Sequence, residues 1–537
     1  MAKRFGVMLD MSRNAVMRPD EVKKFASIIK SFGYNMIQLY TEDTYEVEGE
    51  PYFGYLRGRY SKEELCDIVS YCNSIGVEVI PCIQTLAHLN QIFMWDDYKK
   101  IQDVNDILLA KEARTYELVE NMFKTVKECF TSPIVHIGMD EAHMLGLGKY
   151  LDKYGVENRF DILHDHLEKV MAIAKKYELQ PLMWSDMFFR LANKGEYILK
   201  DTSLITEEVI AAKPDGVDLV YWDYYSNDAM CYKTMLDAHK KFEGDTWFAG
   251  GAWSWRGFAA NNKWTLESMT PAMAECRKAG VDNILMTMWG DDGKECSFYS
   301  LLPSLFAIKK IYDGESDMGK IKKEFSSVTG EDFDSMMLLD MPMGVIGTSP
   351  RDEKLYHKYL LYSDAFLGYL DTAPYKESRE EYEKLSEKLL SAGESSAYRY
   401  IFESHAALCR ALSIKHDLGR RTREAYKSSD KEMLASVIAD YETAIENIET
   451  FVEAFRKLWF KENKPHGFDV EELRLGGLLL RLRSQKMRLQ AFANGEIDVI
   501  EELEDELLEY IGHGNVSGTD KLPVINNWGK TVTPNVL

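Results

Sequence analysis

Eight short apolar runs alternate with helix-like segments between residues 4 and 310 of this 537-residue chain. The runs lack the polar/apolar alternation of a half-exposed sheet, so each predicts a strand that is buried on both faces. Eight such strands alternating with helices favour an α/β fold, a (β/α)8 TIM barrel. A doubly wound open sheet is the alternative, but no glycine-rich phosphate loop follows the first run. The runs are Arg4–Asp10, Tyr34–Tyr40, Glu78–Ile83, Ile134–Gly138, Pro181–Trp184, Asp218–Trp222, Trp247–Gly251 and Asn283–Met288.

The segments between the runs carry helical signals. Apolar residues between Val22 and Ile29 are spaced so that they share one face of a helix. Ser61 and Glu64 form the pattern of a capping box, which opens another helix.

The pattern changes after about residue 310, where the strand-like runs stop. Residues 351–512 have the periodicity of long amphipathic helices rich in Glu, Lys, Leu and Tyr. The stretch from Gly344 to Pro350 is typical of a boundary. We therefore predict a barrel over residues 1–310, a connecting segment over 311–350, and an all-α C-terminal domain over 351–537.

Composition limits the partners and the compartment. The formal net charge of −22 repels phosphate backbones and anionic lipid, so we expect no nucleic-acid partner and no membrane insertion. The chain enters a strand-like run at once, without the apolar stretch of a signal peptide, and no run has membrane length. The eight cysteines lack zinc-site spacing and indicate buried thiols in a reducing compartment, the cytoplasm. We expect no metal and no cofactor, and a homodimer through the helical region is compatible with the sequence.

Charged and aromatic residues follow the predicted strands. The carboxyl ends of the strands form the active-site face of a (β/α)8 barrel. Four tryptophans at matching strand ends predict a shared pocket rather than core packing. Aromatic walls with carboxylates and an arginine suit a sugar, whose C–H faces stack on rings. The same carboxylates disfavour an acidic or phosphorylated ligand. The strand-end candidates are Arg13, Glu42, Asp43, His88, Asp140, Glu141, Trp184, Trp222, Asp223, Tyr224, Trp253, Trp289 and Asp291.

Two adjacent carboxylates, Asp140 and Glu141, follow the fourth apolar run. A rigid strand end can aim such a pair at a ligand. Acidic residues also favour a helix N-terminus, so the pair by itself is equally compatible with the start of the next helix. The aromatic and charged residues at the other strand ends favour a site.

These motifs resemble those of glycoside hydrolase family 20, the β-N-acetylhexosaminidases. They run in the family's order, and the resemblance covers about residues 4–310. The plan of the chain resembles members that lack an N-terminal β domain and carry a helical C-terminal region. The motifs are Leu-Asp-Met-Ser-Arg (9–13), Ala-His (87–88), His-Ile-Gly-Met-Asp-Glu (136–141), Trp-Ser-Asp (184–186), Tyr-Trp-Asp (221–223) and Trp-Gly-Asp (289–291).

The resemblance implies the catalytic roles. In family 20 the sugar's own 2-acetamido oxygen replaces an enzyme nucleophile, so one protonating acid is enough. That acid would be Glu141, which later acts as the base for water. Asp140 would orient the acetamido N–H and stabilise the oxazolinium intermediate. His88, linked to an acid after the second strand, would support Glu141, with Glu42 as the candidate acid and Asp43 as the alternative.

The resemblance also implies binding roles. Arg13 would grip the outer hydroxyls of a terminal sugar, which imposes exo action. Asp291 stands where the family has a glutamate that binds outer hydroxyls. The walls of the acetamido pocket would be Trp184, Trp222 and Trp289.

The sequence departs from the family at two places. The tyrosine often found after the seventh strand is replaced by Gly-Gly-Ala-Trp-Ser-Trp (250–255), so Tyr224 is the candidate for its hydroxyl. Gln38-Leu39-Tyr40 replaces a His-Trp-His motif on the second strand. We assign Asp223 and Trp253 to substrate binding from their strand-end positions.

We therefore expect an exo-acting, retaining β-N-acetylhexosaminidase that removes terminal β-linked GlcNAc or GalNAc. One alternative is a non-catalytic carbohydrate-binding barrel whose helical region docks a partner. Another is a retaining β-glycosidase with an enzyme nucleophile, which would cleave sugars that lack an acetamide.

Overall fold

Eight parallel strands close into a barrel in chain order, with β8 pairing back onto β1. The computed structural model describes residues 2–343, 356–373, 378–510 and 527–536. Every strand begins and ends within two residues of its predicted bounds, which confirms the (β/α)8 barrel. The strands are β1 (Arg4–Asp10), β2 (Met36–Tyr40), β3 (Glu78–Cys82), β4 (Ile134–His136), β5 (Gln180–Trp184), β6 (Asp218–Asp223), β7 (Trp247–Gly251) and β8 (Asn283–Met288).

The strands are apolar because their side chains are buried on both sides of the sheet. Large side chains such as Met8, Ile80 and Leu182 join one buried cluster. Gly6 on β1 lies so close to β2 that a Cβ there would come within 2.5 Å of the Met36 side chain. This position therefore requires glycine for the first two strands to pair.

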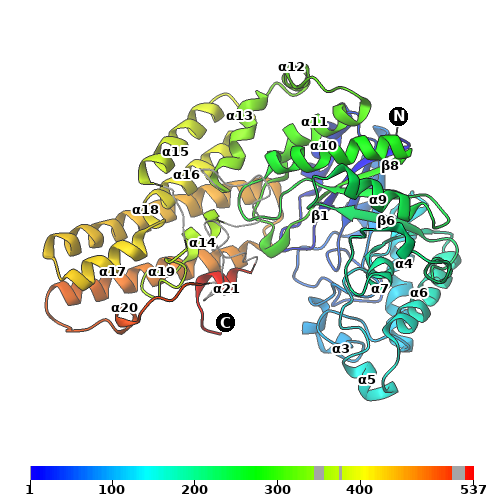
Figure 1. The fold of residues 1–537 in the computed structure, drawn as a ribbon, viewed down its shortest axis with the longest axis horizontal. Helices are drawn as coiled ribbons and strands as arrows, with labels where there is room; N and C mark the ends of the chain where they lie inside the picture. The colour runs from blue at the N-terminus through cyan, green and yellow to red at the C-terminus, as the bar shows by residue number, and fades with distance from the viewer. Residues whose placement is uncertain (1, 344–355, 374–377, 511–526, 537) are drawn as a thin grey trace. The chain divides into compact units, whose positions relative to one another are not determined.

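Helices cover the outside of the barrel, as Figure 1 shows for α4, α6 and α9. The predicted apolar face of α1 is buried, and the predicted capping box at Ser61 opens α2. The helices of this part of the chain are α1 (Pro19–Ser31), α2 (Lys62–Ser74), α3 (Asp96–Lys99), α4 (Ala113–Cys129), α5 (Lys149–Tyr154), α6 (Arg159–Lys176), α7 (Asp186–Ala192), α8 (Glu207–Ala211), α9 (Ala229–His239), α10 (Asn262–Ala279), α11 (Leu302–Asp313) and α12 (Met318–Thr329).

The chain divides into two compact units. The first, called here the barrel unit, comprises residues 1–252, 265–289 and 304–324. The second, the helical unit, takes in residues 253–264 and 290–303, which follow β7 and β8, together with residues 325–537. The range 311–350, for which we predicted a connection, contains α12 and, as far as Met343, further helical turns. The boundary stretch from Gly344 to Pro350 lies outside the described residues.

Long helices make up the helical unit, as the periodicity predicted. Helices α15, α16 and α18 lie side by side in Figure 1, where α15 packs against α16 and α16 packs against α18. Within the described residues, no helix combines the length and the apolar character needed to cross a bilayer. The helices are α13 (Phe333–Met337), α14 (Tyr356–Tyr362), α15 (Arg379–Gly393), α16 (Arg399–Lys415), α17 (Leu418–Ser428), α18 (Lys431–Glu462), α19 (Phe468–Ala493), α20 (Glu501–Glu504) and α21 (Trp528–Val532).

Candidate active site

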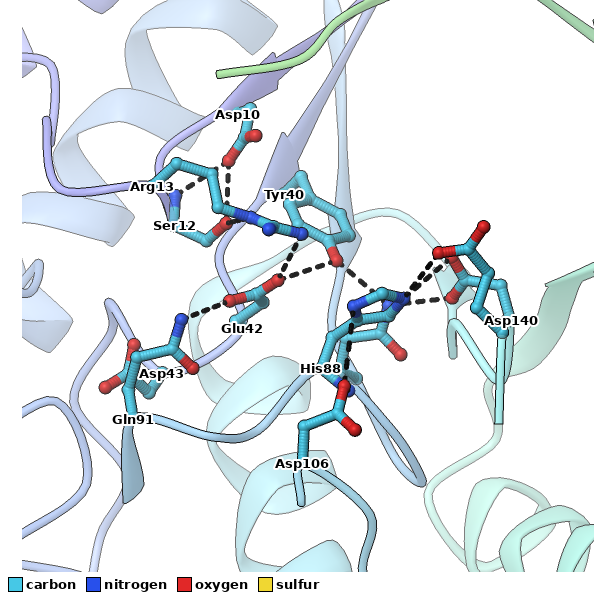
Figure 2. Close-up of polar contacts among 12 residues, drawn as sticks. Asp10, Ser12, Arg13, Tyr40, Glu42, Asp43, His88, Gln91, Asp106 and Asp140 are labelled. Carbon is cyan, nitrogen blue, oxygen red and sulfur yellow. Dashed lines mark hydrogen bonds and ion pairs between the residues drawn. The ribbon is translucent and has the colours of Figure 1, made fainter. Parts of the chain in front are cut away.

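A polar network connects the carboxyl ends of β1 to β4 (Figure 2). At its centre, the imidazole of His88 lies between two carboxylates. Its Nε2 is 3.2 Å from Oδ2 of Asp140, and its Nδ1 is 3.8 Å from Oδ2 of Asp106. The backbone N–H of His88 also donates to Asp106 at 3.0 Å. The ring is therefore fixed from both sides and aimed at the Asp-Glu pair.

The charges of His88 and Asp140 support each other. Burial alone would lower the pKa of His88, but the charges of Asp140 and Glu42 raise it to about 10. Burial alone would raise the pKa of Asp140, but the nearby charge of His88, with the hydrogen bond from Gln84, lowers it to about 2. Asp140 therefore carries its negative charge over the whole neutral range.

Gln84 holds Asp140 from the other side. Its Nε2 donates to Oδ1 of Asp140 at 2.9 Å and contacts the Tyr40 hydroxyl at 3.0 Å. Its Oε1 accepts the backbone N–H of Met139 at 3.3 Å. Gly138 has a φ of +71°, and a Cβ there would be 2.0 Å from this oxygen. The glycine of the motif is thus required by the close approach of Gln84.

The structure corrects the predicted partner of His88. Glu42 contacts Arg13 instead, with Nη2 3.1 Å from Oε1. The Tyr40 hydroxyl donates to the same oxygen, and Gln91 donates to Oε2, each at 3.0 Å. Glu42 is buried, and burial raises its pKa although Arg13 opposes that shift. Its charge still reaches His88, but its hydrogen bonds orient the arginine.

Asp43 is not the partner of His88 either. Its carboxylate pairs with Arg57 at 3.2 Å, and Arg57 also donates to the backbone oxygen of Ser12. Asp43 thereby ties the loop after β2 to the end of β1, beside Arg13. The physical reason for the correction is the path of the loop after β3. This loop places Asp106 beside His88, on the side of the ring opposite Asp140.

Glu141 differs sharply from Asp140 in exposure. Its side chain is 47% exposed, against 13% for Asp140, and its Oε2 is 3.9 Å from Nε2 of His88. Asp186 lies behind it and accepts the Glu141 backbone N–H at 3.4 Å and Nε of Arg190 at 3.3 Å. Burial, with the charge of Asp140, raises the pKa of Asp186 to about 7.

Three of the four predicted catalytic residues have left-handed backbones. The φ angles are +44° at Glu42, +58° at His88 and +52° at Glu141. Such conformations are costly for residues other than glycine, and they persist where the surrounding contacts require them. Their concentration at one end of the barrel supports a functional site.

Aromatic rings cover the other half of the barrel mouth. Trp289 packs edge-on against Tyr40 with ring centroids 4.7 Å apart, and its centroid is 6.0 Å from that of Trp184. Trp222 stacks on Tyr224 at 5.3 Å. Trp222 and Trp289 are partly exposed, whereas Trp184 is buried. The structure thus brings three of the four predicted tryptophans together.

The indole N–H of Trp184 is buried and has no hydrogen-bond partner among the described residues. A buried donor of this kind is normally satisfied, because an unmade hydrogen bond costs free energy. A ligand oxygen within hydrogen-bond distance of this N–H would satisfy it.

The two polar residues that follow Trp222 are already engaged. Asp223 accepts the Tyr221 hydroxyl and the backbone N–H groups of Tyr225 and Ser226, each at 3.0 Å. Those contacts shape the loop after β6, and the assignment of Asp223 to substrate binding stays a prediction. The Tyr224 hydroxyl is hydrogen-bonded to the side chains of Trp289 and Thr287. Its contact with an acetamido oxygen stays a prediction.

The two remaining candidates lie in the helical unit. Trp253 is fully buried, and its ring packs against Trp255 and Trp264 at centroid distances of 4.8 and 6.2 Å. We therefore assign Trp253 to packing rather than to substrate contact. Asp291 begins a short helical turn, Asp291–Gly293, and its role in binding stays a prediction.

Several residues of the network were missed from the sequence. Gln84 follows β3 by two positions and Tyr40 ends β2, so reading every strand end would have found them. Asp106 and Gln91 lie far along the loop after β3, where no spacing marks them. Asp186 is the last residue of the Trp-Ser-Asp motif (184–186), but we predicted no role for it.

Two family models match the chain. The glycosyl hydrolase family 20 catalytic domain matches residues 5–230, and the glycoside hydrolase 20C C-terminal domain matches residues 332–521. The fold and the strand-end geometry agree with these matches, and the chain belongs to glycoside hydrolase family 20.

The chain is also similar to curated proteins and to a solved structure. It is 25% identical over 246 residues to human hexosaminidase D, which covers 44% of this chain and 46% of that protein. It is 26% identical over 169 residues to a β-hexosaminidase from Akkermansia muciniphila, covering 26% of this chain and 34% of that protein. The chain thus spans less than half the length of these relatives. The X-ray structure of a chitobiase from Flavobacterium johnsoniae matches with a TM-score of 0.48 and 15% identity, covering 85% of this chain and 78% of that one.

Proposed function

We propose that this protein is an exo-acting, retaining β-N-acetylhexosaminidase that releases terminal β-linked GlcNAc or GalNAc. The observation that carries the proposal is that two adjacent carboxylates differ in burial and in their hydrogen-bond partners. Asp140 is buried and held ionised by His88 and Gln84, whereas Glu141 is half exposed at the mouth of the barrel. A fixed negative charge beside an exposed proton carrier suits a reaction that develops positive charge next to a leaving group.

The first step forms a cyclic intermediate. Glu141 donates its proton to the glycosidic oxygen as the bond from that oxygen to C1 breaks. The acetamido oxygen of the same sugar forms the new bond to C1, which gives a positively charged oxazolinium ion. Asp140 accepts a hydrogen bond from the acetamido N–H and stabilises the charge.

The second step restores the sugar. Glu141, now ionised, takes a proton from water as the water oxygen bonds to C1 and the acetamido oxygen leaves. Because C1 is attacked twice, the β configuration is retained. Both proton transfers need an ionisable side chain at position 141, which leucine or alanine would not provide.

Arg13 and the tryptophans would determine the specificity of the enzyme for the terminal sugar of a glycan. Glu42 fixes the Arg13 guanidinium at the end of β1, where it can bind outer hydroxyls. Trp222 and Trp289 offer partly exposed faces for the acetamido group and the C–H face of the ring. A pocket closed by an arginine accepts a terminal residue and excludes an internal one.

The test separates the two carboxylates. The Glu141→Gln variant should lose most turnover and still bind a thiazoline, which mimics the oxazolinium ion. The Asp140→Asn variant should lose both turnover and thiazoline affinity, because the charge acts only on the intermediate. Asp67→Asn, on the outer helix α2, is the matched control and should change neither.

Either alternative function makes a different prediction in the same experiment. A carbohydrate-binding barrel would release no chromophore from a β-GlcNAc substrate. An enzyme with its own nucleophile would bind the thiazoline weakly and would tolerate Asp140→Asn on substrates without an acetamide.

We place the enzyme in the cytoplasm. All eight cysteines are free thiols, as expected in a reducing compartment. A homodimer stays a prediction, to be tested by sedimentation of the full chain.

A further inference from the structure

A hollow opens in the barrel unit close in sequence to Glu141. It has a volume of about 450 Å³ and lies between the loop after β4, the start of α6 and the end of α7. This is within the range of roughly 300–1,000 Å³ that small-ligand pockets occupy. Its wall includes Ala142, His143, Arg159, Phe160, Arg190 and Lys194.

The hollow is lined by the two residues that follow Glu141. Ala142 and His143 follow Glu141 directly in the chain. Arg190 donates from Nε to Asp186 at 3.3 Å, and the same Asp186 oxygen accepts the Glu141 backbone N–H. In the proposed reaction the terminal sugar lies against Asp140, and the leaving sugar lies beside Glu141, the residue next to the lining residue Ala142.

The lining of the hollow is basic, although the chain has a net charge of −22. No acidic residue lines it. Within the part of the chain that the structure describes, neither Arg159 nor Lys194 forms an ion pair with a carboxylate. Glu157, the nearest acid before Arg159, is turned away to Lys111 at 2.7 Å. Arg190 is paired with Asp186, so the charges of Arg159 and Lys194 are the ones open to a ligand.

Two contacts hold the guanidinium groups of Arg190 and Arg159 in place. Arg190 donates from Nη1 to the backbone oxygen of Gly195 at 3.0 Å, which fixes its guanidinium at the edge of the hollow. Arg159 donates from Nη1 to the backbone oxygen of His143. Phe160 and Met187 add apolar surface on which a ring can lie.

We propose that this hollow is an aglycone subsite for an anionic sugar, one that carries a carboxylate or a sulfate ester. The inference rests on the proposed function and narrows its substrate class. The negative pocket of Asp140 disfavours an acidic sugar at the cleaved position, whereas the hollow next to it favours one at the neighbouring position. Guanidinium groups bind carboxylate and sulfate oxygens in pairs, which gives the geometric match.

The kinetic test compares three β-GlcNAc disaccharides that differ only in the reducing sugar: glucuronate, 6-sulfated glucose and glucose. The wild-type enzyme should have a higher kcat/KM for at least one acidic substrate than for the neutral one, by about five- to tenfold at low salt. In R159Q/K194Q this ratio should approach one. In K100Q, an exposed lysine on the β3 side of the barrel, it should stay as in the wild type, as should the rate on a chromogenic β-GlcNAc substrate. A ratio near one in the wild-type enzyme, or a ratio unchanged in R159Q/K194Q, would overturn the subsite.

A binding test separates failure of the subsite from failure of the proposed activity. Saturation-transfer NMR with methyl β-glucuronide, methyl 6-sulfo-β-glucoside and methyl β-glucoside needs no turnover. An acidic ligand should give a signal that R159Q/K194Q loses and K100Q keeps. If none of the acidic ligands binds, the subsite is wrong even in an active enzyme; if an acidic ligand binds but no β-GlcNAc substrate is cleaved, the proposed function is wrong and the anion site remains.

Discussion

The two halves of the barrel mouth are built differently. The ends of β1 to β4 carry a charged network in which His88, Asp140 and Glu42 each have fixed partners. The ends of β5, β6 and β8 carry Trp184, Trp222 and Trp289. A ligand would interact with the first half through charges and hydrogen bonds, and with the second half through the contact area of the rings. Changes in the charged half should therefore alter kcat and its pH dependence, whereas changes in the aromatic half should alter KM.

The largest effect is expected at Asp140. The Asp140→Asn variant keeps the shape of the side chain but loses the charge that, as we propose, stabilises the intermediate. We expect kcat on a β-GlcNAc substrate to fall by about 10²- to 10³-fold. Steady-state kinetics at pH 6 to 7 measure this directly. A variant that kept more than half of its turnover would show that the charged half is not the catalytic half.

His88 should control the pH range of activity. In the wild type, His88 holds the pKa of Asp140 at about 2, so Asp140 stays ionised down to strongly acidic pH. In His88→Gln the pKa of Asp140 should rise, and activity should begin to fall at a higher pH. Each unit by which the pKa exceeds the pH lowers the ionised fraction about tenfold. Profiles of kcat from pH 3 to 7 for the variant and the wild type make the comparison, and superimposable acidic limbs would contradict it.

The sequence predicted the strands well because both faces of each strand are buried. A parallel barrel strand reads as one apolar run, and the runs Arg4–Asp10, Trp247–Gly251 and Asn283–Met288 match the observed strands residue for residue. The strand ends then follow from chain order alone. That is why Arg13 and Asp140 could be placed at one face without any knowledge of contacts.

The contacts across that face could not be read in the same way. The partner of His88 depends on the path of the loop after β3, which brings Asp106 to the ring. The burial of Trp253 depends on packing within the helical unit, and a strand-end position does not encode it. The position of a residue in the sequence therefore predicts the end of the barrel at which it lies. Its contacts depend on the paths of the loops, which the sequence pattern does not show.

The aromatic half should respond more weakly. In Trp289→Leu the ring contact with Tyr40 is lost, together with the surface on which we propose that the sugar stacks. A ring contact of this kind contributes about 0.5–1.5 kcal/mol, so kcat/KM should fall about two- to twelvefold, mainly through KM. Trp255→Leu, in the helical unit, is the aromatic control. A loss confined to kcat would mean that Trp289 acts on the chemistry rather than on binding.

The smallest effect is on stability. The folded pKa of His88 is about 10, above its ordinary value of about 6.5, so its ionised form stabilises the fold. This stabilisation is complete below about pH 6.5 and is lost as the pH rises towards 10. The difference in unfolding free energy between the wild type and His88→Gln should therefore be larger at pH 5.5 than at pH 9.5. Urea denaturation at both values measures it, and an equal difference would contradict the ion pair.

The most direct test of the account is the dependence of hydrolysis on the acetamido group. The 4-nitrophenyl glycosides of β-GlcNAc and β-glucose differ only at C2, so Trp222 and Trp289 offer the same ring faces to both. If the sugar's own amide is the nucleophile, kcat/KM for the β-GlcNAc glycoside should be higher by a factor on the order of 10³ or more. Comparable values for the two glycosides would contradict the assignment of Asp140 as the residue that steadies that amide.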